Sequence, residues 1–210
     1  MTRVLIADDH AVVRRGVREM IASEFRDAMC AEASDGLQTL DLIQAHVWDL
    51  LILDLSMPGH GGIEVLIALQ SMASKPRVLV LSMHGEDQYA KRVLMAGAKG
   101  YLHKSSLPDE LIKAIRKVLA GGRYVSAALA EKLAEHLTDE VETPAHESLS
   151  DREFEILGLI ASGKTVGQIA EDLHLAVTTV STYRTRILEK MHKTTTADLI
   201  RYAIENHLAD

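Results

Sequence analysis

Three carboxylates, a hydroxyl and an ammonium follow four short apolar runs in the first half of the chain. In chain order they are Asp8 with Asp9, Asp54, Ser82 and Lys104. Clustered carboxylates repel one another, and a divalent cation relieves that repulsion; ligands that are all oxygens suit Mg²⁺. Aspartate is also a known nucleophile toward phosphorus and forms an acyl phosphate. If these side chains meet in space, they predict a phosphoryl-transfer site.

Asp54 is the candidate nucleophile, because it ends a central apolar run and precedes a turn-rich loop, Leu55 to Gly59. Mg²⁺ and Lys104 would neutralise charge on the phosphoryl oxygens, which is most of what phosphoryl transfer requires. Taken singly, an Asp after a strand is usually a turn residue, and a lone Lys is usually solvated. Their common position at strand ends favours the functional interpretation. Three histidines lack the spacing of metal ligands and are predicted to lie at the surface: His60, His84 and His103.

The apolar runs are too short for helices and predict parallel strands that are buried on both faces. The predicted strands are Val4 to Ala7, Met29 to Ala33, Leu50 to Leu53, Val78 to Leu81 and Gly100 to Leu102. The predicted helices are His10 to Ser23, Gly36 to His46, Gly62 to Ala73, Asp87 to Ala96 and Pro108 to Ala120. This alternation predicts a five-stranded, doubly wound α/β domain over residues 1–122, with ligands at the carboxyl ends of its strands.

The pattern changes after Gly121-Gly122. Residues 123–148 are predicted to be a linker with a short helix capped by Ser126 and an acidic part from Thr138 to Ser148. Residues 149–210 predict an all-α domain of four helices. Their expected starts are capping boxes at Ser150 with Glu153 and Thr165 with Gln168, then Thr178 as cap of a helix to about His192, and finally Thr196. On the last helix we expect Leu199, Ile200, Ala203 and Ile204 to face inward.

The formal net charge of the 210 residues is -7, from 23 basic and 30 acidic side chains, which argues against a generally basic surface for nucleic acid. The charge is unevenly distributed, however. Residues 1–125 carry 15 basic and 15 acidic side chains, whereas residues 126–148 carry 1 and 6. From Thr178 to Lys193 there are four basic side chains and one acidic one, Glu189. The total charge therefore hides a locally basic helix.

This basic helix is the second of two helices separated by a break at His174 to Ala176. A helix-turn-helix at about 166–185 would place the start of the second helix in the major groove of DNA, where Thr, Ser and Arg read base edges and Lys and Arg meet phosphates. The residues assigned to DNA are Thr165, Thr178, Thr179, Ser181, Thr182, Arg184, Thr185, Arg186 and Lys190. The predicted buried stripe is Val180, Tyr183, Ile187 and Met191. By pattern alone, a solvated amphipathic helix stays open as the alternative.

Residues 3 to about 122 resemble the receiver domain of two-component response regulators. The matching motifs are Asp8-Asp9, LDLSMPG from Leu53 to Gly59, LSMHGED from Leu81 to Asp87 and AGAKGYLHK from Ala96 to Lys104. The resemblance implies a flavodoxin-like fold and phosphoryl transfer from a sensor histidine kinase to Asp54. It also implies a metal site and switch residues: Asp8, Asp9, Asp54 and the backbone carbonyl of Ser56 for the metal, Ser82 and Lys104 for the phosphoryl group, and Tyr101 as the switch aromatic. Ser105 stands where receivers commonly have proline, which bears on a cis peptide bond there and leaves the chemistry intact.

Leu149 to Met191 resembles the LuxR-type four-helix DNA-binding domain, so nearly the whole chain is similar to response regulators of the NarL/FixJ class. The resemblance implies binding to double-stranded DNA at inverted half-sites by a homodimer that forms in the active state. Gly167 and Ser181 stand where the family often has lysine. Some phosphate and base contacts of relatives are therefore absent, and the operator sequence of relatives does not transfer to this chain.

The cysteine count and the apolar segments indicate the compartment. Cys30 is the only cysteine, which excludes an intrachain disulfide framework and a cysteine-rich metal site. The N-terminal apolar run is interrupted by Asp8-Asp9, unlike a signal peptide. No uncharged apolar stretch reaches the ~18 residues that span a bilayer. We therefore expect a cytoplasmic protein with no membrane partner.

The sequence predicts a transcriptional regulator that is switched by phosphorylation of Asp54 and is not a turnover enzyme. In our hypothesis the unphosphorylated receiver masks the recognition helix or disfavours the dimer. One rival is a Mg²⁺-dependent phosphatase of the haloacid dehalogenase type, but such enzymes need a D-x-D pair on one strand. The chain instead has adjacent Asp8-Asp9 and a distant Asp54. Another rival is a regulator whose receiver is never phosphorylated and serves only for dimerisation.

Overall fold

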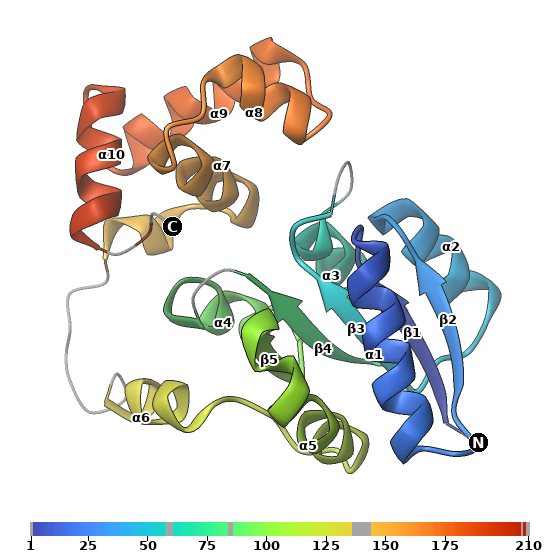
Figure 1. The fold of residues 1–210 in the computed structure, drawn as a ribbon. Helices are drawn as coiled ribbons and strands as arrows, with labels where there is room; N and C mark the ends of the chain where they lie inside the picture. The colour runs from blue at the N-terminus through green and yellow to red at the C-terminus, as the bar shows by residue number, and fades with distance from the viewer. Residues whose placement is uncertain (1, 58–60, 84–85, 136–143, 207, 209–210) are drawn as a thin grey trace. The chain divides into compact units, whose positions relative to one another are not determined.

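The computed structural model describes residues 2–57, 61–83, 86–135, 144–206 and 208. The chain divides into two compact units, Met1–Glu135 and His136–Asp210 (Figure 1). Of the acidic part of the predicted linker, residues 138–143 lie outside the described residues. The short helix predicted in the linker is α6 (Ala127–Glu135). It belongs to the first unit, and the Oγ of Ser126 accepts the backbone N–H of Leu129 at its start.

A parallel sheet forms the centre of the first unit. Its strands are β1 (Arg3–Ala7), β2 (Met29–Ala33), β3 (Leu50–Asp54), β4 (Arg77–Ser82) and β5 (Gly100–His103). They are ordered β2-β1-β3-β4-β5, and every neighbouring pair is parallel. The strand order therefore reverses at β1, between β2 and β3, and a switch of this kind is where open α/β sheets bind ligands. The five predicted strands are confirmed.

Helices cover both faces of the sheet. They are α1 (Ala11–Glu24), α2 (Gly36–Ala45), α3 (Gly62–Gln70), α4 (Glu86–Met95) and, after a 3₁₀ turn at Lys104–Ser106, α5 (Leu107–Leu119). Alternate residues of each strand face α1 and α5, with Ile6, Ile52 and Leu81 packed against Ile21 and Leu111. In Figure 1 both helices lie in front of the sheet, with α2 and α3 behind it. Covering both faces explains why the central strands β1, β3 and β4 are apolar at every position between their end residues.

Most helix boundaries in the first unit differ from those predicted, each by one residue except the end of α3, which differs by three. Helix α3 ends at Gln70 rather than Ala73, because the N–H groups of Ser71 and Met72 turn back to carbonyls three residues earlier and close the last turn. Helix α4 begins at Glu86, one residue before the predicted Asp87. None of these differences alters which strand ends lie beside one another.

The second unit consists of helices after a short 3₁₀ turn, Ala145–Ser148. They are α7 (Asp151–Ala161), α8 (Val166–Asp172), α9 (Val177–Lys190) and α10 (Thr196–Glu205). Both predicted capping boxes are confirmed, with Ser150 and Thr165 accepting the backbone N–H groups of Glu153 and Gln168. The predicted all-α domain of four helices is therefore present.

The predicted cap of the third helix was wrong. Helix α9 begins at Val177, and its N-cap is Ala176, whose carbonyl accepts the N–H groups of Thr179 and Val180. Thr178 lies within the first turn and offers its carbonyl to the hydroxyl of Thr182. The break before α9 starts at Leu173, and His174 takes a left-handed backbone (φ 54°) that closes the end of α8.

The inward face of α10 was also partly wrong. Leu199 and Ala203 are fully buried, one helical turn apart, and Ile200 is half-buried, whereas the Ile204 side chain is 59% exposed. On a helix, position 204 is rotated by about 140° from position 199, so it leaves the buried line. The stripe predicted on α9 is confirmed for Val180, Ile187 and Met191, while Tyr183 is half-buried.

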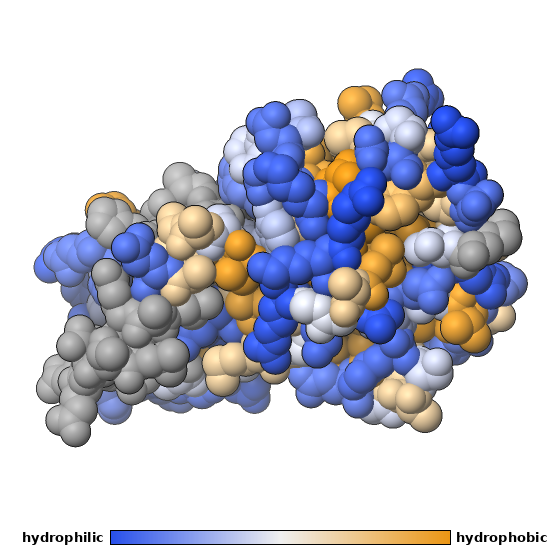
Figure 2. Space-filling model, turned by 90° about the horizontal axis from the view of Figure 1, so that it is seen from below, coloured by the Kyte–Doolittle hydropathy of each residue, from blue (hydrophilic) through white to orange (hydrophobic). Residues whose placement is uncertain are grey.

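Apolar side chains are concentrated in these two cores. On the face of the molecule shown in Figure 2, hydrophilic side chains surround separate groups of apolar ones. Among the residues that the structure describes, no helix combines the length and the apolar character needed to span a membrane.

Candidate functional sites: an acidic pocket and a basic helix

The register of the sheet brings the predicted chemical residues to one edge. Asp54 pairs with Leu81, the residue before Ser82, and Ser82 pairs with His103, the residue before Lys104. On the other side of β3, Ala7 pairs with Leu53, so Asp8 lies beside Asp54. Three of these side chains are almost fully buried: those of Asp8, Asp54 and Ser82. The predicted convergence of these strand ends is confirmed.

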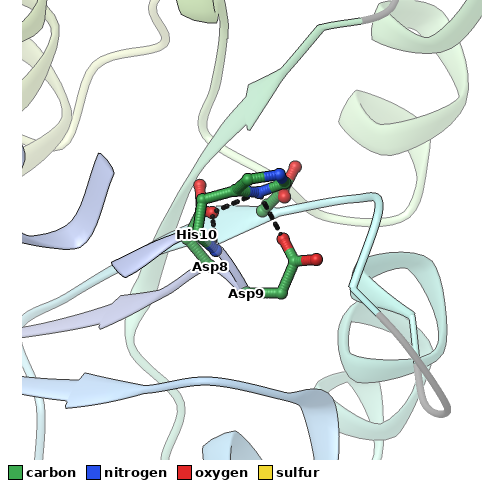
Figure 3. A group of neighbouring side chains, drawn as sticks. Asp8, Asp9 and His10 are labelled. Carbon is green, nitrogen blue, oxygen red and sulfur yellow. Dashed lines mark hydrogen bonds and ion pairs between the residues drawn. The ribbon is translucent and has the colours of Figure 1, made fainter. Parts of the chain in front are cut away.

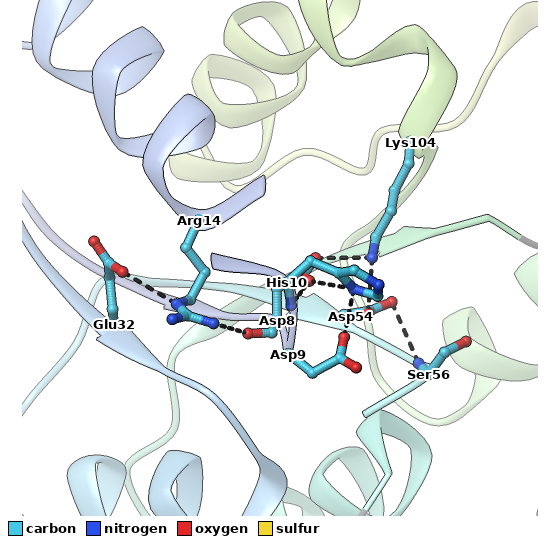
Figure 4. Close-up of polar contacts among 8 residues, drawn as sticks. All are labelled: Asp8, Asp9, His10, Arg14, Glu32, Asp54, Ser56 and Lys104. Atoms are coloured by element: carbon cyan, nitrogen blue, oxygen red, sulfur yellow. Dashed lines mark hydrogen bonds and ion pairs between the residues drawn. The ribbon is translucent and has the colours of Figure 1, made fainter. Parts of the chain in front are cut away.

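Lys104 bridges the two buried carboxylates (Figure 4). Its Nζ lies 2.8 Å from Oδ2 of Asp54 and 2.8 Å from Oδ2 of Asp8. All three side chains are less than a tenth exposed. A buried charge without a partner costs several kcal/mol, so this ammonium offsets much of the repulsion between the two carboxylates. The site thus has a fixed positive charge beside the candidate nucleophile.

The pKa values of this pair follow from burial and from mutual contact. Burial raises the pKa of Asp54 above its ordinary value, and the hydrogen bond and charge of Lys104 offset only part of that effect. Burial acts to lower the pKa of Lys104, but the hydrogen bonds and charges of Asp54 and Asp8 outweigh it and raise the pKa. Lys104 is therefore a permanent cation at neutral pH.

The acidic pocket offers donors that fit a divalent cation. One ligand atom from each of Asp8, Asp9, His10 and Asp54 lies within 4.8 Å of all the others. Two ligands of one Mg²⁺ ion are at most about 4.2 Å apart, since each lies about 2.1 Å from the ion, so small side-chain movements suffice. The carboxylate oxygens match the hard-ligand preference of Mg²⁺. The predicted carboxylates Asp8, Asp9 and Asp54 are thus brought together.

Two further predicted residues lie on β5 and on the loop after β3. Ser56 is exposed on the loop after β3, and its N–H donates to Oδ1 of Asp54 at 3.3 Å. Tyr101, the predicted switch aromatic, is fully buried on β5, next to Val80 of β4. The peptide bond between Lys104 and Ser105 is trans, and no cis peptide bond occurs among the described residues. Of the motif residues, Pro58, Gly59, His60, His84 and Gly85 lie outside the described part of the chain.

Arg14 is a positioning residue that was not predicted. Its Nη1 donates to the main-chain carbonyl of Asp8 at 2.7 Å, and its Nε donates to Glu32 at 3.1 Å (Figure 4). It ties the end of β1 to α1 and β2. The available signal was its position one helical turn after His10, which points its side chain back toward the strand end.

The surface role predicted for His103 was wrong. This side chain is half-buried, with Nε2 2.8 Å from the main-chain oxygen of Met83 and Nδ1 2.6 Å from the Ser105 hydroxyl. It joins the ends of β4 and β5 beside Lys104. The sequence does not indicate the contact with Met83, because that residue lies 20 positions earlier in the chain.

Gly62 fixes the loop that leaves Asp54. A Cβ atom at this position would lie 2.1 Å from the main-chain oxygen of Asp54, closer than atoms can approach. The Gly62 N–H also donates to the carbonyl of Leu55 at 3.1 Å. The first turn of α3 therefore packs directly on the backbone of Asp54, and only glycine leaves room for it.

Helix α9 presents a polar face to solvent. Among the residues assigned to DNA, Thr165, Thr178, Thr182, Thr185, Arg186 and Lys190 are exposed, and Thr179, Ser181 and Arg184 are half-buried. The hydroxyls of Thr182 and Thr185 donate to carbonyls one turn earlier, which holds their methyl groups and oxygens in fixed rotamers. Val177, the first residue of α9, is an apolar side chain that is 54% exposed.

Lys190 has an internal partner as well. Its Nζ lies 2.6 Å from Oε2 of Glu153, a carboxylate that is only 4% exposed and that also accepts the N–H and hydroxyl of Ser150. The ion pair joins the end of α9 to the capping box of α7. Lys190 therefore helps to hold the recognition helix in place, and a DNA phosphate would have to share its charge with Glu153.

The Glu153 carboxylate makes the second unit sensitive to acid. Burial acts to raise its pKa, but the hydrogen bonds from Lys190 and Ser150 outweigh burial and lower the pKa. A carboxylate whose pKa is lowered by folding stabilises the fold above its unfolded pKa of about 4.3, and that contribution is lost as the pH falls through the lower, folded value. We expect Glu153→Gln to reduce hydrogen-exchange protection in α7 and α9 at about pH 7, and the difference from wild type to shrink at about pH 3.

The matched control is Glu155→Gln on the same helix. Glu155 pairs with Arg152, its neighbour on α7, at 2.7 Å. A pair within one helix is worth about 0.3–0.5 kcal/mol, so this variant should change protection little at either pH. Equal effects of the two variants, or an effect of Glu153→Gln that does not change with pH, would contradict the assigned role of Glu153.

Two family models match separate parts of the chain. The response regulator receiver domain matches residues 4–116, and the bacterial regulatory proteins of the luxR family match residues 147–203. The first match covers the unit with the acidic pocket, and the second covers α7 to α9 and most of α10. The two matched segments coincide with the two parts of the chain that carry the candidate sites.

Similar proteins cover the whole chain. Response regulator UvrY of Escherichia coli (strain K12) is 33% identical over 211 residues, which cover 100% of this chain and 97% of UvrY. Response regulator GacA of Pseudomonas aeruginosa is 35% identical, with 100% of this chain and 99% of GacA covered. The solved structure of RcsB from Salmonella enterica serovar Typhimurium, bound to promoter rprA in the presence of phosphomimetic BeF₃⁻, has a TM-score of 0.67 and 26% identity. It covers 96% of this chain and 98% of RcsB.

Proposed function

Because the chain belongs to the two-component response regulators that join a receiver domain to a LuxR-type DNA-binding domain, we propose that phosphorylation of Asp54 controls DNA binding by α9. The chain is a DNA-binding response regulator. The observation that carries the residue assignment is the buried contact of Lys104 with Asp54 and Asp8 at 2.8 Å each. It supports the proposal that Asp54, which ends the central strand β3, is a nucleophile beside a fixed cation.

The phosphoryl group comes from a phosphohistidine of a sensor histidine kinase. An oxygen of the Asp54 carboxylate attacks phosphorus, so that a P–O bond forms while the P–N bond breaks. The imidazole keeps the electron pair of that bond and leaves neutral when its other nitrogen carries a proton. Lys104 neutralises charge on the phosphoryl oxygens, and the Ser82 hydroxyl at the end of β4 donates to one of them. Tyr101 then changes its packing on β5 as the switch aromatic.

Membership in the receiver family implies a divalent cation at the acidic pocket, and we assign Mg²⁺ to it. The carboxylates of Asp8, Asp9 and Asp54 and the backbone carbonyl of Ser56 would hold the ion. When bound, the ion supplies positive charge that complements Lys104 on the phosphoryl oxygens. The residues of this chain align the nucleophile and exclude bulk water: Asp54 and Ser82 are both fully buried.

DNA recognition belongs to the helix-turn-helix at about 166–185. The exposed hydroxyls of Thr178, Thr182 and Thr185 lie toward the start of α9, where a recognition helix meets base edges, and Arg186 extends toward phosphates. The half-buried Thr179, Ser181 and Arg184 border this face, and Thr165 and Lys190 flank it. We assign residues 1–122 to the receiver, 123–148 to the linker and 149–210 to DNA binding.

The active species is a homodimer on inverted half-sites, acting in the cytoplasm. A modest local charge predicts weak non-specific binding, so tight binding requires two helices on one DNA site. A receiver of this kind accepts one phosphoryl group and is not a turnover enzyme. The chain lacks the D-x-D pair that a phosphatase of the haloacid dehalogenase type needs at the end of one strand. Steady turnover of a small phosphoester would nevertheless support that alternative.

The test compares DNA selection and oligomeric state with and without acetyl phosphate and Mg²⁺. Phosphorylated protein should sediment as a dimer and enrich inverted repeats from random duplexes, with affinity at least about tenfold above that of the untreated protein. Chelation of the metal during phosphorylation should remove both effects. Equal affinity and mass in the two states would leave only the rival in which the receiver is never phosphorylated.

A further inference from the structure

His10 turns its ring back over the carboxylates that precede it. Its backbone N–H donates to Oδ1 of Asp8 at 2.8 Å, which bends the chain at the start of α1. The imidazole Nδ1 consequently lies 2.6 Å from Oδ1 of Asp9 and 3.3 Å from Oδ1 of Asp8 (Figure 3). A nitrogen donor thus lies at the solvent side of a site that is otherwise built from oxygens.

The ring is also available to a ligand. The His10 side chain is 65% exposed, so packing does not hold it in another rotamer. The other cations near the pocket have different partners from His10: Lys104 contacts Asp8 and Asp54 through their Oδ2 atoms, and Arg14 contacts the carbonyl of Asp8 and the carboxylate of Glu32. His103, the other histidine at this edge among the described residues, has both ring nitrogens occupied by Met83 and Ser105. Of the two, His10 is the histidine whose nitrogen points into the donor cluster.

We infer that His10 is a nitrogen ligand of the metal site and that it raises the preference of the acidic pocket for Mn²⁺ and later divalent transition metals relative to Mg²⁺. The inference rests on the proposed metal site. Mg²⁺ takes oxygen ligands and keeps several waters, whereas imidazole suits transition metals, whose affinity for a given nitrogen–oxygen site rises from Mn²⁺ toward Cu²⁺. Replacing one water by the imidazole therefore strengthens binding of Mn²⁺ more than binding of Mg²⁺.

The test uses full-length protein, with Mn²⁺ as the spectroscopic probe. Electron spin echo envelope modulation of bound Mn²⁺ should show ¹⁴N coupling in the wild type and no ¹⁴N coupling in His10→Ala. Mn²⁺ affinity, measured from the free-ion signal, should fall about tenfold in the variant, and Mg²⁺ affinity, measured by competition, should fall by less. The control is His46→Ala, an exposed histidine at the end of α2, which should retain both the coupling and the affinity.

Three results would overturn the inference. The first is that Mn²⁺ binds to the wild type without ¹⁴N coupling. The second is that His10→Ala loses Mn²⁺ affinity and Mg²⁺ affinity equally. The third is that this variant gains Mg²⁺ affinity. The last result would mean that the ring only competes with the ion for Asp9. Labelling of the wild type by acetyl phosphate with Mg²⁺ separates this inference from the proposed function. If labelling occurs without ¹⁴N coupling, only the inference fails, whereas the absence of both divalent binding and labelling contradicts the proposed function.

Discussion

Replacement of Asp54 by asparagine should abolish labelling of the chain by acetyl phosphate in the presence of Mg²⁺. The amide is not a nucleophile toward phosphorus, and loss of a covalent nucleophile typically costs orders of magnitude, so we expect a fall of at least about 100-fold. Intact-protein mass spectrometry after a fixed reaction time measures the phosphorylated fraction directly. Labelling at the wild-type level would disprove the assignment of Asp54.

The variant should fold, which makes its loss of labelling interpretable. Asp54 is fully buried, and its pKa is raised mainly by that burial. A raised pKa in the folded chain means that the ionised carboxylate opposes folding at neutral pH, so a neutral amide of the same size removes that cost. Lys104 keeps its contact with Asp8. We therefore expect a melting temperature equal to or above that of the wild type.

Asp49→Asn is the matched control for this variant. Asp49 lies immediately before β3, whereas Asp54 ends the same strand. The Oδ2 of Asp49 accepts the backbone N–H of Arg3 at 2.7 Å. The substitution is identical, but the residue lies at the opposite edge of the sheet from Lys104. Labelling should continue at the wild-type rate, and a comparable loss in this control would show that the effect of Asp54→Asn is not specific to the nucleophile.

Reversing the charge of Arg186 should weaken DNA binding on the order of 100-fold. An arginine contact with DNA is worth about 1–3 kcal/mol, and a glutamate at the same position adds repulsion from phosphates. Arg186 is exposed on α9, so Arg186→Glu should leave the packing of Val180 and Ile187 intact. Fluorescence anisotropy of phosphorylated protein on its selected duplex, measured over a series of salt concentrations, should also give a shallower salt dependence.

Arg201→Glu controls for net charge. Arg201 is an exposed arginine of the same unit, but it lies on α10 instead of the recognition helix. Arg201→Glu changes the total charge of the chain by the same amount as Arg186→Glu, so any effect of overall charge should be equal in the two variants. We expect a change of no more than about threefold for Arg201→Glu. Similar losses of DNA affinity in both variants would contradict the assignment of Arg186 to a DNA contact.

Secondary structure followed the local sequence closely. Runs of four apolar residues such as Val78 to Leu81 predicted strands because strands of a doubly wound sheet are buried on both faces, and the structure places every one of them in the sheet. Capping boxes at Ser150 and Thr165 fixed two helix starts, because the hydrogen bonds involved join residues three apart. The error at Thr178 has the same origin, since a polar residue near a helix start is a cap only when its backbone is extended, and here Ala176 takes that position.

Residues that act through long-range contacts could not be assigned in this way. The acidic pair, Asp54 and Lys104 were found because each follows a strand, and parallel strands end at one edge. His103 and Lys190 were placed wrongly or only in part, because their partners are far away in sequence: Met83 for His103, and Glu153 for Lys190. A side chain on a helix face has the same local pattern whether it meets DNA, solvent or a buried carboxylate.

The sequence alone determined the two folds and the family and proposed the nucleophile, since these depend on periodicity, strand ends and motifs that are local to the chain. The tertiary structure decided how charge is distributed among those residues. Burial and the 2.8 Å contacts assign Lys104 to both Asp8 and Asp54, and the backbone bend at Asp8 turns His10 toward the carboxylates. Distances between side chains set electrostatic energies, and those distances exist only after the strands have packed.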